Sequence, residues 1–179
     1  MIDPVTTLRL GYRAAFLAIA AFLMFVRLLP LSAIPATWPG PDLLLGMTIV
    51  WVLRRPDCVP LGAIVAVFLL DDLLSMRPPG LWTLIVLLGT EFMRSRAALT
   101  RDLPFLLEWL MSAAVILGMI VANRIALTVF MVPMTGFGPV LLEYLSTMIA
   151  YPVIVAVSAW ALGLRKAAPG QVDALGHRL

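Results

Sequence analysis

Two adjacent aspartates, Asp71 and Asp72, end a long apolar run and are followed at once by a turn rich in proline. They lie within residues 68–82, which read FLLDDLLSMRPPGLW. In a lipid bilayer, a carboxylate near the end of a spanning helix is costly unless it meets a partner, a cavity or the interface. Neighbouring residues on a helix point about 100° apart, so these two carboxylates cannot share a proton as a catalytic dyad does. The pair therefore predicts a contact surface, and we find no catalytic motif elsewhere in the sequence.

The elements that must position these aspartates are apolar segments separated by short loops. A helix needs about 20 residues to cross a hydrocarbon core of about 30 Å. The pattern predicts six helices, over residues 14–34, 42–53, 59–74, 81–92, 105–132 and 140–164. The predicted fold is all-α, a polytopic membrane protein with six transmembrane helices. Its predicted parts are a cytoplasmic segment at 1–13, a transmembrane domain at 14–164 and a cytoplasmic tail at 165–179.

The composition supports a membrane protein. The 179 residues are 62% hydrophobic and 13% charged, with a mean hydropathy of +1.02. A soluble domain is roughly half apolar and about a quarter charged. The net charge of +3 and the pI of about 9.6 would normally suggest a nucleic-acid partner. Because the basic residues fall between the apolar runs, they indicate topology instead, and no nucleic-acid partner is expected.

Cysteine and histidine are too scarce for the commonest metal and redox sites. Cys58 is the single cysteine and His177, in the polar tail, is the single histidine. An intrachain disulfide and a multi-cysteine metal site are therefore impossible, and a histidine-based metal or proton-relay site is disfavoured. The sequence predicts no metal and no cofactor.

The basic residues also set the orientation. With six spans, ten of them fall on one side of the membrane: Arg9, Arg13, Arg54, Arg55, Arg94, Arg96, Arg101, Arg165, Lys166 and Arg178. Of the loops predicted on the other side, near residues 36, 77 and 136, only the second carries a basic residue, Arg77. The positive-inside rule then places both termini in the cytoplasm.

Seven charged residues fall in the outer half of this arrangement: Arg27, Asp42, Asp71, Asp72, Arg77, Arg124 and Glu143. They could be interfacial or reach water by snorkelling, with internal ion pairs fixing the helices. They could instead line a cavity, or dock a helix or linker of a partner. A proton pathway is a third reading, although no carboxylate lies at the predicted midplane. Because Arg27 and Asp42 flank one short loop, we expect them to form a structural ion pair.

At two places the sequence resembles the MreD family of rod-shape-determining membrane proteins. The resemblance rests on PDLLLGMTIVWVLRRPD, beginning at Pro41, and on FLLDDLLSMRPPGLWTL, beginning at Phe68. The matching positions are Pro41, Asp42, Asp72, Leu73, Leu74, Ser75, Pro79 and Gly80. The chain departs from the family pattern at the extra acid Asp71 and in the turn 76–78, where small residues are expected.

The resemblance implies a non-enzymatic scaffold in the bacterial inner membrane that maintains rod shape during cell elongation. It implies binding to an MreC-like single-span protein, and through it a link to MreB filaments, a RodA-like glycosyltransferase and a transpeptidase of peptidoglycan synthesis. The residues expected to bind the partner are Asp71, Asp72, Ser75, Arg77, Pro79 and Gly80. The family's fold is similar to the substrate-binding subunits of energy-coupling-factor transporters. That similarity supplies the alternative function, a vitamin-type capture subunit of a membrane transporter, which would need an outward-open pocket.

Overall fold

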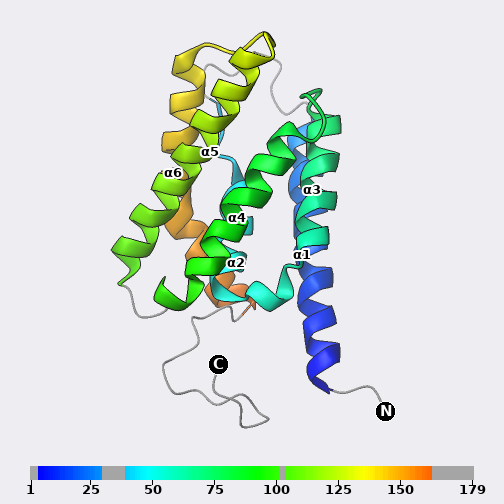
Figure 1. The fold of residues 1–179 in the computed structure, drawn as a ribbon. Helices are drawn as coiled ribbons and strands as arrows, with labels where there is room; N and C mark the ends of the chain where they lie inside the picture. The colour runs from blue at the N-terminus through cyan, green and yellow to red at the C-terminus, as the bar shows by residue number, and fades with distance from the viewer. Residues whose placement is uncertain (1–3, 30–38, 101–103, 163–179) are drawn as a thin grey trace.

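The computed structural model describes residues 4–29, 39–100 and 104–162 of the chain. Within these ranges the chain is helical, with no β-strand. The elements, coloured in chain order in Figure 1, are α1 (Pro4–Leu28), α2 (Leu43–Arg54), the short 3-10 helix η1 (Pro56–Cys58), α3 (Leu61–Leu74), α4 (Leu81–Thr100), α5 (Phe105–Val129) and α6 (Phe137–Leu162). The all-α prediction is confirmed for the described residues.

Helix α2 forms the centre of the fold. It is apolar on every side, and all ten residues from Leu44 to Leu53 are buried. Such a helix is stable only when it is surrounded by others, and α2 packs chiefly against α4 and α6, with smaller contacts to α1 and η1. Twelve residues extend only about 18 Å at 1.5 Å per residue, so α2 is shorter than a full span.

In the described part of the chain, three helices are long and apolar enough to cross a membrane by themselves. They cover Thr7–Leu28, Phe105–Val129 and Phe137–Trp160. The first belongs to α1, which begins at Pro4, well before the predicted start at residue 14. Near the end of this added segment, Arg13 Nη2 donates to the Asp57 carbonyl in η1 at 3.3 Å. The predicted end of this helix at residue 34 lies outside the described residues.

Helix α4 also differs from its prediction. It continues through residues 93–100, where a basic loop was expected. Arg94 explains the extension, since its Nε lies 2.8 Å from Glu91 Oε1 one turn earlier. Its guanidinium also donates to the carbonyls of Pro56 and Val59, at 3.2 and 2.7 Å. These contacts tie the last turns of α4 to the α2–α3 connection.

Helix α6 passes through Pro152 without ending. A proline inside a helix has no N–H to donate, so the carbonyl four residues earlier loses its partner. Here that carbonyl belongs to Met148, and the Trp109 indole of α5 donates to it at 3.0 Å. A side chain from the neighbouring helix thus replaces the missing bond and holds α5 against α6.

The elements alternate in direction, so the chain folds with two distinct ends. Helix α1 begins and α6 ends at the end where η1 also lies, the lower end in Figure 1. The turns joining α3 to α4 and α5 to α6 lie together at the opposite end. We call these the inner and the outer end. The outer end carries the charged residues that the sequence singled out.

Candidate functional site

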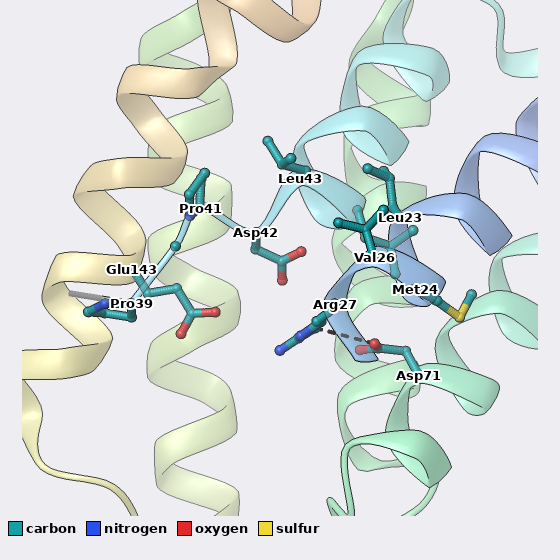
Figure 2. Close-up of a pocket in the computed structure, with 12 residues that line it drawn as sticks. Leu23, Met24, Val26, Arg27, Pro39, Pro41, Asp42, Leu43, Asp71 and Glu143 are labelled. Atoms are coloured by element: carbon teal, nitrogen blue, oxygen red, sulfur yellow. Dashed lines mark hydrogen bonds and ion pairs between the residues drawn. The ribbon is translucent and has the colours of Figure 1, made fainter. Parts of the chain in front are cut away.

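The outer end contains a recess built from two adjoining hollows of about 420 and 390 Å³. Arg27, Asp42 and Glu143 line both hollows and therefore form their common wall. The first hollow lies between α1, the start of α2 and α6, as Figure 2 shows, with these three side chains directed toward its centre. The second lies toward α5 and its turn into α6, and Arg77 and Arg124 line it. We call the two hollows together the outer recess.

Asp71 and two arginines form an ion-paired cluster beside the outer recess. Asp71 Oδ1 lies 3.3 Å from Arg27 Nη1, and its Oδ2 lies 2.9 Å from Arg77 Nη2. The carboxylate is almost completely buried, whereas the side chains of Arg27 and Arg77 keep 47% and 27% of their surface exposed. Asp71 is therefore the buried member, and the two guanidiniums also reach the recess.

The predicted ion pair between Arg27 and Asp42 is not found among the described residues, where Arg27 pairs with Asp71 instead. Asp42 has another role, because its Oδ1 accepts the N–H of Leu45 at 3.0 Å and so caps the first turn of α2. The Asp42 backbone N–H donates to Thr147 Oγ1 of α6 at 2.8 Å. Asp42 thus fixes the outer end of α2 against α6 while it lines the recess.

Asp72 is a structural residue in this fold. Its side chain is fully buried, and Oδ2 accepts the N–H of Gly80 at 3.1 Å and both the N–H and hydroxyl of Thr83, at 3.2 and 2.8 Å. The first N–H groups of a helix have no partner within the helix, so a carboxylate at the end of α3 caps the start of α4. The Asp72 carboxylate is thus enclosed within this chain, and its role in binding a partner protein stays a prediction.

The rest of the predicted docking turn is partly accessible. Pro79 is exposed, whereas Ser75, Arg77 and Gly80 are half-buried. Gly80 has a φ of +88°, in the region that favours glycine, and this conformation aims its N–H at Asp72. Ser75 Oγ lies 3.4 Å from Arg77 Nη2 and supports the arginine that reaches Asp71. The turn serves first to position Asp72 and Arg77.

The remaining outer-half charges, Arg124 and Glu143, both line the second hollow. The Arg124 guanidinium lies 4.7 Å from the ring centre of Phe137 and donates to the Thr135 carbonyl at 3.3 Å. No hydrogen bond or ion pair to the Glu143 carboxylate is found in the described part of the chain. Glu143 is thus a half-buried charge free to meet a ligand.

A second buried polar cluster lies toward the inner end, and the sequence analysis did not predict it. Arg54 Nη2 lies 3.6 Å from Glu108 Oε1, with the two side chains 9% and 0% exposed. Beside it, Ser112 and Tyr151 share a hydrogen bond of 3.0 Å between their hydroxyls. The signal that could have revealed this cluster is Glu108, a lone acid early in a long apolar segment. Its partner Arg54 lies 54 positions earlier in the sequence, so the pair itself leaves no local pattern.

The outer recess is lined by charged and polar groups. Its walls bring together three arginines and three carboxylates, of which only Asp71 is enclosed by its partners: Arg27, Arg77, Arg124, Asp42, Asp71 and Glu143. Asn123, Tyr144 and Thr147 add further polar groups that the sequence analysis missed. Among the residues that the structure describes, no group of three or more histidine, cysteine, aspartate or glutamate side chains is arranged to hold a metal ion.

Comparisons of the chain with protein-family models, curated proteins and solved structures returned no match.

Proposed function

We propose that this chain is a non-enzymatic, multi-pass scaffold of the bacterial inner membrane that takes a segment of a partner protein into its outer recess. The resemblance to MreD supports an MreC-like single-span partner and a place in the cell-elongation machinery. The observation that carries the proposal is the convergence of charges from α1, α2, α3, α5 and α6 on the recess. Charges near a bilayer are costly without a partner, and Glu143 has none within the described chain.

The form of the recess favours a polypeptide occupant. Two hollows that share one charged wall make a site longer than either hollow alone. An extended chain fills such a site with successive side chains, and its peptide groups can bond to the polar walls. A partner that passes through the membrane once presents such a segment where it leaves the bilayer, at the level of the outer turns.

Capture of a small solute is the second candidate. Ligand pockets commonly measure about 300–1,000 Å³ and combine apolar walls with a few placed polar groups. Each hollow falls in that range, at about 420 and 390 Å³. The two functions differ in outcome, because a capture subunit would lose solute uptake and keep its protein partners when the recess is altered.

Charge reversal at Glu143 tests the scaffold proposal. We expect Glu143→Lys to fold and reach the membrane, because the carboxylate makes no bond within the described chain. Capture of the MreC-like partner should fall by about tenfold or more, since reversing a partly desolvated charge at an interface is worth at least about 1.4 kcal/mol. Rod-shaped cells should round up, and Glu143→Gln should show a smaller defect.

Asp57→Lys provides the matched control, because it reverses an exposed charge at the inner end. It should leave capture of the partner unchanged. Undiminished capture and normal cell shape in a well-expressed Glu143→Lys strain would contradict the scaffold proposal.

The proposal includes six spans with both termini in the cytoplasm, and cysteine labelling tests this topology. Cys58 is buried in η1, and burial raises the pKa of its thiol, so the native chain should label slowly. In a Cys58→Ser background we expect Gly136→Cys to react with an impermeant maleimide from the periplasm. Asp57→Cys should react only after permeabilisation. Periplasmic labelling at residue 57 would overturn the proposed orientation.

A further inference from the structure

Two helices end at the outer end with the same motif and the same unusual residue. In α3 the N–H of Arg77 donates to the Asp72 carbonyl at 3.0 Å, and in α5 the N–H of Val132 donates to the Leu127 carbonyl at 2.9 Å. Each bond spans five residues, as in the Schellman motif that closes many helices. The residue before each donor occupies the left-handed position of that motif. It is Met76 after α3 and Met131 after α5, each with a φ of +52°.

Methionine is poorly suited to this position on two counts. A side chain with a Cβ is strained at positive φ, which is why glycine is usual there. The two side chains are also 94% and 92% exposed, so they add almost nothing to the packing of this chain. Glycine would relieve the backbone and remove the exposed apolar surface. Neither the turn nor the core accounts for methionine at these positions.

The location of the two methionines points to a use. Both turns lie at the outer end (Figure 1). Met76 lines the hollow of about 390 Å³, and the two residues after Met131, Val132 and Pro133, line the same hollow. Met76 therefore belongs to the rim of the outer recess, and Met131 directly precedes two residues that line the same rim. Methionine is flexible and polarizable, which suits contact with apolar side chains of varied shape.

We propose that Met76 and Met131 are the apolar rim contacts for the polypeptide segment that occupies the outer recess. This inference rests on the scaffold function proposed above and specifies the chemistry of the partner. Beside the groups that meet the charged walls, the segment carries apolar side chains that cover the two methionines. An amphipathic segment fits, whereas a uniformly charged linker does not.

Glycine and alanine substitutions at these two positions distinguish the effect of backbone strain from the effect of losing the methionine side chain. The double variant Met76→Gly/Met131→Gly should raise the thermal midpoint of the purified protein in detergent, by about 2–4 °C per substitution as strain is removed. Capture of the co-expressed MreC-like partner should fall by about tenfold. The matched variant Met76→Ala/Met131→Ala keeps the strained backbone, so it should lose capture to the same extent without the rise in midpoint.

A glycine variant that captures the partner as well as the native chain would overturn this assignment while leaving the scaffold function in place. Undiminished capture combined with weaker partitioning of the variant into liposomes would assign the methionines to lipid contact and would also overturn it. Failure of the native chain to capture the partner at all would overturn both proposals together.

Discussion

Asp72→Ala is expected to lower the free energy of unfolding by about 2–4 kcal/mol, the largest loss for any single carboxylate at the outer end. The alanine removes the carboxylate, whose Oδ2 accepts three hydrogen bonds from Gly80 and Thr83. The two Thr83 donors are buried at the start of α4 and the Gly80 N–H is partly buried, so lipid and protein offer them no replacement acceptor. The effect should appear as a lower thermal midpoint and a lower yield in detergent.

Three variants serve as controls for Asp72→Ala. Asp72→Asn can keep its oxygen at the position of Oδ2 and place its amide nitrogen at Oδ1, which has no hydrogen-bond partner. Its free energy of unfolding should therefore fall by only about 1 kcal/mol. Thr83→Val removes only the hydrogen bond from the Thr83 hydroxyl, and its loss of unfolding free energy should be of similar size. Asp71→Ala should be milder than Asp72→Ala, because Arg27 and Arg77 are partly exposed and can turn to water. A thermal midpoint unchanged in Asp72→Ala would refute the capping role.

Arg54→Ala is expected to destabilise the fold by about 3–5 kcal/mol, because it leaves the fully buried Glu108 without its cation. Removing one member of a buried pair is far more harmful than removing both. Adding Glu108→Gln to Arg54→Ala should therefore recover more than half of the loss. Unfolding in denaturant, followed by tryptophan fluorescence in detergent, would measure all three variants.

The single variant Glu108→Gln should be milder than Arg54→Ala. An arginine at the last turn of α2 can extend its guanidinium toward the inner interface, whereas Glu108 has no such route from its buried position. If the losses in Arg54→Ala and Glu108→Gln simply add in the double variant, the two side chains do not interact energetically.

The apolar pattern predicted the helices of this chain better than it predicted their ends. Helix α2 was expected at 42–53 and is found at Leu43–Arg54, because its aspartate cap and its closing arginines are local signals. The starts of α1 and the last turns of α4 were missed. Both are polar extensions held by Arg13 and Arg94, whose acceptors lie in and around η1. Contacts between segments that are distant in the sequence produce no local sequence pattern, so these helix ends could not be predicted.

The same reasoning explains which parts of the site could be predicted. Hydropathy and the predicted topology gave each charge a predicted depth, and that was enough to gather Arg27, Asp42, Asp71 and Glu143 at one end. The direction in which each side chain faces depends on how the helices pack. Arg27 therefore took a partner on α3 instead of the nearby Asp42. Asp71 and Asp72 diverge as their helical spacing predicts, one toward arginines and one into the α4 cap.

The central claim is that a partner segment occupies the outer recess, and site-specific photo-crosslinking in cells tests it most directly. A benzophenone side chain at Thr135, exposed on the wall of the second hollow, should form an adduct with the MreC-like partner. The same group at Ile149, 74% exposed on α6 and absent from both hollows, should form none. An adduct from Ile149 alone, or none from Thr135 while the two proteins co-purify, would contradict the account.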